Sequence, residues 1–308
     1  MPATMTAREW AMLLALSVLW GGSFFFVAVA LSGFPPLTIV LLRVGLAAVA
    51  LAGACVVLRL ALLGTREAWI ACAGMGLLNN AVPFTLIALG QQHIPSGLAA
   101  VVNAATPVFA VLAAHWLAGD ERLTANRLAG TLMGLVGVAI LTGPAALTWG
   151  RGDEALGIIL CLGACLSYGL TGVWSRRLRR VGIAPLPAAA GQCVCSTLMM
   201  LPLALVVDQP WTLGAPSAEA VAAVAGLGLL STALAYALFY LILAGAGATN
   251  TMLVTLLVPV TALLLGTFAL REALEPRHLL GMAVIGAGLT LIDGRLLRAA
   301  TAPRRTNR

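Results

Sequence analysis

The feature that most constrains this chain is a succession of apolar runs, each about 20 residues long and separated by short polar segments. A helix rises about 1.5 Å per residue, so a run of this length can cross a hydrocarbon core about 30 Å thick. Only 9% of the 308 residues are charged, against about a quarter in a typical soluble domain. We therefore expect lipid to be the solvent of this chain. The runs fall at 10–31, 36–58, 68–90, 96–118, 126–143, 155–175, 186–207, 219–243, 247–269 and 277–294.

The arginines predict how these helices enter the membrane. All 18 cationic residues are arginine, and they lie mostly in short loops and tails. With the N-terminus inside, fourteen of the 18 fall on the inner side, three fall outside, and Arg43 lies within a run. Cytoplasmic loops carry the positive excess in membrane proteins. We therefore expect a multi-pass protein of the inner (plasma) membrane with both termini cytoplasmic, and no nucleic-acid partner.

The first apolar run has a second interpretation. Arg8, the apolar residues after it and Ala28-Val29-Ala30 could form a cleavable signal peptide. The run is long for such a signal, and its Trp20-Gly21 pair has a counterpart in the second half of the chain. We therefore expect the run to stay in the mature protein as its first span.

The two halves of the chain match each other at nearly constant spacings of 148 to 152 residues. Each half holds five runs, an odd number, so the second half must enter the membrane in the opposite orientation. Inverted repeats are typical of secondary transporters, with the substrate site near the midplane where the halves meet. The matching pairs are Trp20-Gly21 with Tyr168-Gly169, Pro36 and Arg43 with Pro185 and Gln192, Gly76-Leu77-Leu78 with Gly228-Leu229-Leu230, Pro107 with Pro259, and Glu121 with Glu272.

We predict an all-α integral membrane protein with ten transmembrane helices, arranged as two inverted five-helix repeats around a central cavity. The first repeat would span 1–147 and the second 154–295, with a basic cytoplasmic tail at 296–308. Both repeats belong to one chain, so a monomer suffices to build the site, and an oligomer stays possible.

Several motifs resemble the EamA branch of the drug/metabolite transporter superfamily. They are Trp20-Gly21-Gly22-Ser23-Phe24, Pro36 followed by Arg43, Pro107, and Gly119-Asp120-Glu121-Arg122-Leu123. Their order and spacing make the match specific, and it extends over about residues 10–294. The resemblance implies a ten-helix fold with a central cavity and the export of amino acids or related metabolites. It does not name a substrate.

Three spans contain an interior proline, at Pro83, Pro107 and Pro259. A proline kinks a helix and leaves the carbonyl four residues earlier without its donor. Those carbonyls belong to Asn79, Asn103 and Thr255, which are themselves polar. Kinked segments at corresponding places in two halves point to a transporter site. We therefore assign Asn79, Asn103 and Thr255 to substrate binding, although packing against neighbouring helices is the competing interpretation.

Aromatic residues complete the candidate site. Trp20 and Tyr168 are repeat mates, and Tyr236 lies in a span as well. A ring with a polar tip can line a cavity and hold an amphipathic ligand. Ordinary helix packing is the alternative for each of the three. Asn79 has a neighbour, Asn80, and because adjacent helical residues point in different directions, we expect only one of the two amides to face a cavity.

Arg43 is the only formal charge well inside a span. An arginine at the centre of a membrane helix costs about 2.5–3.5 kcal/mol on insertion scales. It could pair structurally, extend its side chain to the outer surface, or bind a substrate carboxylate or act in gating. No acidic residue lies in the middle of any run, which disfavours a permanently cationic substrate.

The proposed partners are a small-molecule substrate and the lipid bilayer, with no cofactor and no metal. The six cysteines lie in apolar runs without metal-ligand spacing. We predict a secondary transporter that exports amino acids or related metabolites by alternating access. An exporter of drugs or other metabolites without amino-acid preference is the alternative. A membrane-embedded enzyme would need a nucleophile–base pair or metal ligands at membrane depth, and neither is visible.

Overall fold

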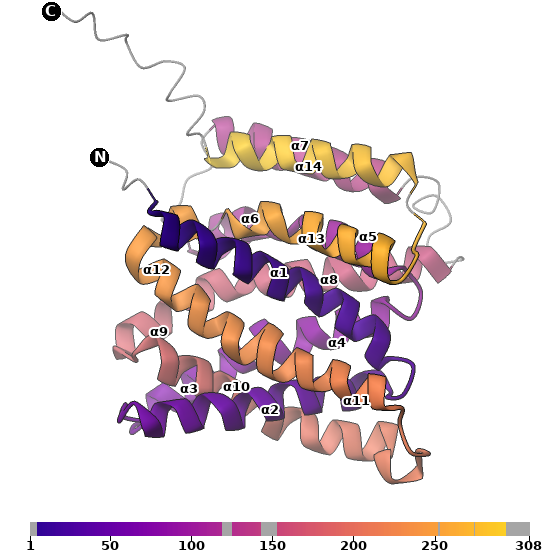
Figure 1. The fold of residues 1–308 in the computed structure, drawn as a ribbon. Helices are drawn as coiled ribbons and strands as arrows, with labels where there is room; N and C mark the ends of the chain where they lie inside the picture. The colour runs from indigo at the N-terminus through magenta and orange to yellow at the C-terminus, as the bar shows by residue number, and fades with distance from the viewer. Residues whose placement is uncertain (1–4, 119–124, 143–152, 252, 274, 294–308) are drawn as a thin grey trace, which may run out of the picture.

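The computed structural model describes residues 5–118, 125–142, 153–251, 253–273 and 275–293, and the regular elements in these ranges are all helical (Figure 1). Within these described ranges, seven segments are long and apolar enough to cross a membrane. The predicted all-helical class is confirmed, while the count of ten spans and the inverted repeat stay predictions. The seven segments are Ala7–Ala30, Pro36–Val57, Arg66–Gly90, Ser96–Leu117, Asp153–Val181, Pro185–Asp208 and Ala218–Gly247, and shorter apolar stretches lie at Leu128–Gly137 and Leu257–Ala269.

Several of these segments consist of more than one helical element. The elements are α1 (Ala7–Ala30), α2 (Pro36–Val57), α3 (Arg66–Met75), η1 (Gly76–Ala81), α4 (Val82–Gly90), α5 (Ser96–Asn103), α6 (Thr106–Ala118), α7 (Ala125–Thr142), α8 (Asp153–Trp174), α9 (Arg176–Val181), α10 (Pro185–Leu203), η3 (Ala204–Asp208), η4 (Pro210–Thr212), α11 (Ala218–Ala225), η5 (Gly226–Leu234), α12 (Ala235–Thr251), α13 (Val254–Ala269) and α14 (Pro276–Asp293).

Short local signals set the starts of these helices. Thr6 and Glu9 form a capping box at the start of α1. Thr65 and Ser217 cap α3 and α11 through their hydroxyl oxygens. Prolines begin α2 and α10, where the missing N–H is not needed.

Two carboxylates from the second half cap helices of the first half. Glu272 accepts hydrogen bonds from the backbone N–H groups of Ser96 (2.7 Å) and Gly97 (2.8 Å), at the start of α5. Asp208 accepts from the backbone N–H of Thr38 at 2.6 Å and from its hydroxyl at 2.9 Å, in the first turn of α2. A carboxylate at a helix N-terminus also interacts favourably with the helix dipole. These contacts hold the two halves together at one end of the molecule.

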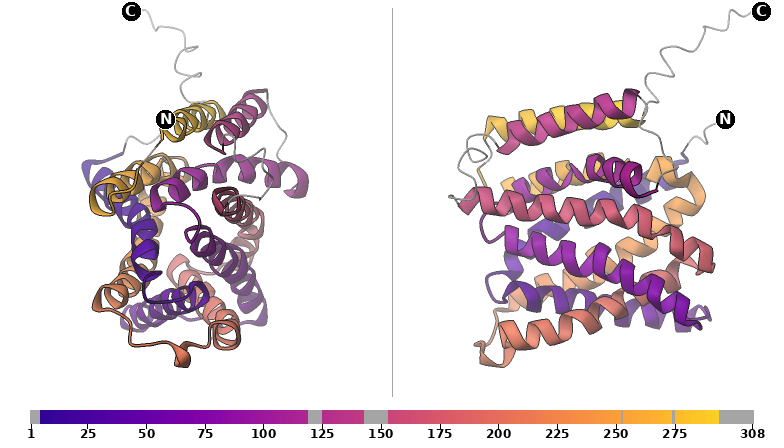
Figure 2. Two further views of the ribbon diagram at one scale, coloured as in Figure 1. Left: turned by 90° about the vertical axis from the view of Figure 1, so that its right-hand side faces the viewer. Right: turned by 180° about the vertical axis from the view of Figure 1, so that it is seen from behind.

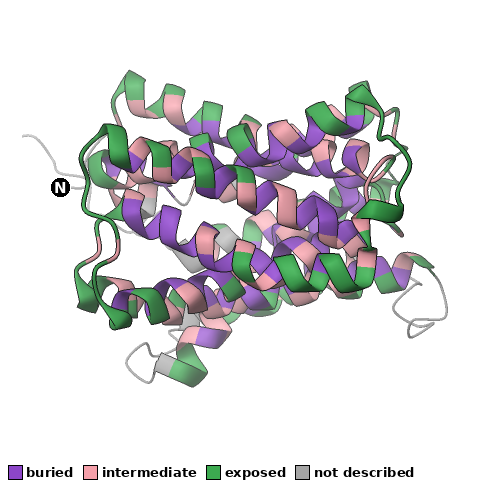
Figure 3. Cartoon of the chain, turned by 90° about the horizontal axis from the view of Figure 1, so that it is seen from below, coloured by how far each residue is buried: buried purple, intermediate pink, exposed green. Residues whose placement is uncertain are grey.

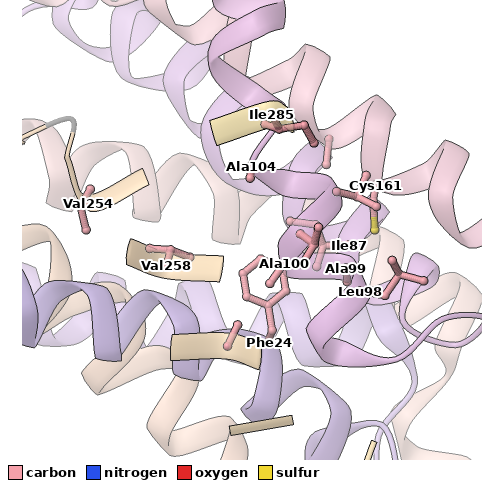
Figure 4. Close-up of a cluster of buried hydrophobic side chains, with 14 of the residues drawn as sticks. Phe24, Ile87, Leu98, Ala99, Ala100, Ala104, Cys161, Val254, Val258 and Ile285 are labelled. Carbon is pink, nitrogen blue, oxygen red and sulfur yellow. The ribbon is translucent and has the colours of Figure 1, made fainter. Parts of the chain in front are cut away.

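Helices of the first half pack against helices of the second half. The repeat mates α2 and α10 pack together, as do α7 and α14, while α1 packs against α13 and α6 packs against α8. Figures 1 and 2 show α7 and α14 side by side as an outer layer next to α5, α6 and α13. A buried cluster joins residues from α1, α4, α5, α8, α13 and α14, among them Phe24, Leu98, Cys161, Val258 and Ile285 (Figure 4).

The outward faces of the helices are apolar. Val57 and Phe268 are each 80% exposed, and Trp116 is 76% exposed. Exposed and buried residues alternate along the helices, with buried residues where helices meet (Figure 3). So many large apolar side chains on the surface would be a liability in water, whereas lipid accommodates them.

Two π-helical segments lie at equivalent places in the two halves. The segment η1 contains Gly76, and η5 contains its repeat mate Gly228. A π-helix changes the hydrogen-bond register locally and is frequent at functional sites. Side-chain hydroxyls bind carbonyls of both segments: Ser196 donates to Gly76 (3.0 Å) and Thr232 donates to Leu227 (2.8 Å).

Candidate substrate site

A network of polar side chains connects η1 of the first half with α10 and α12 of the second. Asn79 donates from Nδ2 to the Tyr236 hydroxyl at 3.0 Å and to Gln192 Oε1 at 3.4 Å. The Tyr236 hydroxyl in turn donates to Asn80 Oδ1 at 2.7 Å. Asn80 also donates to Ser196 Oγ at 3.0 Å. The network therefore joins two halves of the chain through groups that carry both donors and acceptors.

The two neighbouring amides play different parts in this network. Asn80 is fully buried, and all of its contacts are with protein groups of α10 and α12. Asn79 is partly exposed, and no described group donates to its Oδ1. One amide therefore packs against neighbouring helices, as expected, while contact of the other with a ligand stays a prediction. The structure identifies Asn79 as the one that stays accessible.

Arg43 lies within the bundle beside this network. It is 6% exposed, so its side chain does not extend to the outer surface. Its Nε donates to Thr232 Oγ1 at 3.0 Å, and its guanidinium carbon lies 3.5 Å from the centre of the Phe84 ring. Gln192, the repeat mate of Arg43, is 2% exposed and belongs to the network through Asn79. Each of the two repeat mates thus places a buried polar side chain inside the bundle, and Tyr236 of the network lies near Arg43.

Aromatic rings from both halves lie next to the polar groups. Trp20 of α1 packs on Phe239 of α12, with ring centroids 5.6 Å apart, and Phe239 meets Tyr240 edge-on at 5.4 Å. Tyr168 of α8 is partly exposed and packs against two of the buried clusters. Tyr236 is buried, whereas Trp20 and Tyr168 are partly buried, and the assignment of all three to substrate binding stays a prediction.

The helix α5 ends at Asn103, and two turn residues separate it from α6, which begins at Thr106. The Asn103 carbonyl accepts a hydrogen bond from the Thr106 hydroxyl at 2.8 Å. The prediction that this carbonyl would lack a donor was therefore wrong, because a side chain one turn later replaces the N–H that Pro107 lacks. The Asn103 side chain is partly exposed, and its Oδ1 lies 4.0 Å from Cys165 Sγ.

The other two prolines occupy different positions in their helices. Pro83 lies at the start of α4, directly after η1. The change in hydrogen bonding before this proline therefore falls within a π-helical segment. Pro259 lies inside α13, and Thr255 lies in the first turn of the same helix. The break in this region comes earlier, at Gly247, whose backbone has φ 80°. That φ favours glycine, which has no Cβ to clash. Since α13 packs on α5, Thr255 and Asn103 lie on neighbouring helices.

The site residues predicted from the sequence did not include Asn80, Gln192, Ser196 or Thr232. Two signals could have identified them. Gln192 is the repeat mate of Arg43, and Ser231-Thr232 is the polar counterpart of Asn79-Asn80. Among the described residues, no three His, Cys, Asp or Glu side chains gather in a way that could hold a metal ion. The arrangement offers amide, hydroxyl and guanidinium groups, which suit recognition of a small polar molecule.

The family model and the relatives that match this chain are those of transporters. The model of the EamA-like transporter family matches residues 8–143 and 155–293. A probable terminal-alkyne amino-acid exporter from Streptantibioticus cattleyicolor is 30% identical over 303 residues, which covers 96% of this chain and 97% of the relative. The uncharacterized inner membrane transporter YedA from Escherichia coli is 29% identical over 285 residues, with coverage of 91% and 89%. A solved crystal structure shares the fold, with a TM-score of 0.67 at 20% identity over 95% of this chain and 99% of that one.

Proposed function

Since this chain belongs to the EamA-like transporter family, we propose that it exports amino acids or related small metabolites across the inner membrane by alternating access. The observation that carries the proposal is the network of Asn79, Gln192 and Tyr236 next to the buried Arg43. Buried polar groups are costly in an apolar bundle unless they are paired or bind something. The amino-acid exporter among the relatives favours the same class of substrate.

The ten-helix inverted repeat remains part of this proposal, and two structural features support it. The π-helical segments η1 and η5 occupy equivalent positions in the two halves. The helix pairs also correspond. By the repeat spacing α1 matches α8 and α13 matches α6, so interchanging the halves turns the pair of α1 and α13 into the pair of α8 and α6. Two halves related in this way can exchange conformations, which would open a central cavity first to one side and then to the other.

Alternating access assigns a role to the carboxylate caps. With the N-terminus inside, Glu272 and Asp208 lie at the outer end, where they bind α5 and α2 of the other half. These hydrogen bonds must separate when the cavity opens outward. These hydrogen bonds are formed among the described residues, which supports a state closed at the end that the proposed topology places outside. The residues with proposed roles in the cavity are Trp20, Asn79, Asn103, Tyr168, Tyr236 and Thr255, with Pro83, Pro107 and Pro259 at helix irregularities.

The function is tested in cells that overproduce the protein. We expect greater resistance to toxic amino-acid analogues than in cells with an empty vector, and a higher extracellular level of at least one amino acid. The medium is analysed by mass spectrometry. A well-produced protein that raises other metabolites but no amino acid would replace the amino-acid proposal with the alternative substrates.

The orientation is tested by cysteine labelling. All six native cysteines are buried, so an impermeant maleimide should find only an introduced thiol. We expect Gly214→Cys to react from outside in intact cells and Arg179→Cys to react only after the membrane is permeabilised. Both positions are exposed. Reaction at position 179 in intact cells would contradict the proposed topology.

A further inference from the structure

Arg43 is a buried cation whose charge no described residue neutralises. Its Nε donates to Thr232, and Phe84 covers one face of the guanidinium plane. The titratable groups that interact with it electrostatically are Tyr168, Tyr236 and Cys193, and phenols and thiols are ordinarily uncharged at pH 7. Buried arginines are normally paired with an acid, so the missing partner calls for an explanation.

Most of the hydrogen-bonding capacity of Arg43 is unused. A guanidinium has five N–H donors, and the bond to Thr232 uses the one on Nε. No described acceptor binds the two Nη nitrogens, because the bond to Thr232 is the only one that Arg43 makes within the described ranges. Thr232 itself is fixed by its bond to the Leu227 carbonyl. The guanidinium is therefore held in orientation at Nε while its two Nη nitrogens remain available.

We propose that Arg43 binds the carboxylate of the transported molecule, an inference that rests on the proposed transport function. Two parallel N–H groups on Nη atoms match the two oxygens of a planar carboxylate. One arginine balances one negative charge, so a monoanionic group fits this site, whereas a doubly charged phosphate ester would leave an excess charge in a low-dielectric interior. The recognised class is thus small monocarboxylates, including zwitterionic amino acids.

The polar network next to Arg43 supplies a place for an amino group. Asn79 Oδ1 accepts no hydrogen bond from a described group, and Asn79 is linked through Nδ2 to the Tyr236 hydroxyl. Tyr236 lies near Arg43. A molecule whose carboxylate binds the Nη donors of Arg43 and whose ammonium donates to Asn79 Oδ1 would use both of these unpaired groups. Recognition would then depend on the carboxylate more than on the amine, because only the carboxylate neutralises a buried charge.

The test compares three related molecules on the purified protein. L-Phenylalanine carries both groups, 3-phenylpropionate lacks the amine, and L-phenylalanine amide lacks the carboxylate. We expect the first two to raise the thermal unfolding temperature of the detergent-solubilised protein and the amide to leave it unchanged. In proteoliposomes, 3-phenylpropionate should compete with labelled L-phenylalanine and the amide should not. Equal binding or competition by the amide would overturn the carboxylate assignment, and this comparison needs no variant.

Variants locate the site. Arg43→Gln should weaken binding of 3-phenylpropionate by about 30-fold or more, because it removes one partner of a buried charge pair. Arg43→Lys should recover part of the binding, and Arg66→Gln, which changes an exposed arginine at the start of α3, should bind normally. Without ligand, Arg43→Gln should unfold at the same or a higher temperature, since it removes an unpaired charge. If the Arg43→Gln variant binds 3-phenylpropionate as tightly as the wild type does, the carboxylate binds elsewhere.

The two proposals can fail separately. Carboxylate binding that depends on Arg43, without flux of any amino acid, would reject the amino-acid proposal and support this site. If L-phenylalanine amide competes with amino-acid flux and Arg43→Gln leaves that flux unchanged, the transport function is retained and this site is rejected.

Discussion

Replacing Asn79 with leucine is expected to lower transport per folded molecule by at least about tenfold, with a smaller loss of folded protein than Asn80→Leu causes. Asn79 is partly exposed, and no described group donates to its Oδ1, which is the acceptor that we propose for the ligand. Leucine has a similar volume but cannot accept a hydrogen bond. Asn79→Ser should retain more transport than Asn79→Leu, because it keeps a polar group. The measurement is flux of labelled amino acid per folded molecule.

The neighbouring residue gives a matched comparison. Asn80 is fully buried and binds Ser196, Cys193 and Tyr236. Asn80→Leu would leave the buried Tyr236 hydroxyl without the acceptor of its proton and would remove a donor from Ser196. A buried group left unsatisfied costs about 1–3 kcal/mol. We expect a lower folded yield and a lower unfolding temperature. If instead Asn79→Leu lowers the yield and Asn80→Leu leaves both yield and transport normal, the division of roles between the two amides is wrong.

Gly288→Leu is expected to separate α7 from α14 and to remove most of the folded protein. A Cβ at Gly288 would lie 2.6 Å from the Gly130 carbonyl oxygen and 2.9 Å from the Gly134 nitrogen. Both are backbone atoms, which cannot move aside as a side chain can. Overpacking of this kind costs about 1–3 kcal/mol, and more where backbones must separate. Small residues allow such close approach between membrane helices.

Gly286 supplies the control on the same helix. A Cβ at Gly286 meets nothing within 4 Å, so Gly286→Leu should give near-normal yield and normal transport. The yield is measured by fluorescence-detected size-exclusion chromatography, and thermal unfolding is followed on the purified variants. A Gly288→Leu protein as stable as Gly286→Leu would contradict the packing of α7 on α14.

The positions of the helices could be predicted from the sequence because apolar length and proline placement act locally. The expected spans 36–58 and 68–90 correspond closely to Pro36–Val57 and Arg66–Gly90. The close approach of α7 and α14 depends on glycine, because a Cβ at Gly288 would meet backbone atoms of Gly130 and Gly134. Gly130 and Gly288 have glycine repeat mates, Gly281 and Gly137, so part of the signal was present in the sequence itself.

The contacts between helices could not be predicted in the same way. The sequence places Asn79 and Asn80 side by side, but only the packing of α10 and α12 decides which of them is buried. The Thr106 hydroxyl that binds the Asn103 carbonyl depends on a local break in the backbone, which hydropathy does not report. The neighbours of Arg43 likewise come from α4 and η5, distant in the sequence.

The most direct test of the transport account is flux through the purified protein. Proteoliposomes loaded with unlabelled L-phenylalanine are placed in a trace of labelled L-phenylalanine, and accumulation of label by exchange is followed over time. We expect saturable accumulation that is lost with Asn79→Leu and retained with Gly286→Leu. Folded wild-type protein that exchanges neither this nor any other amino acid would contradict the account.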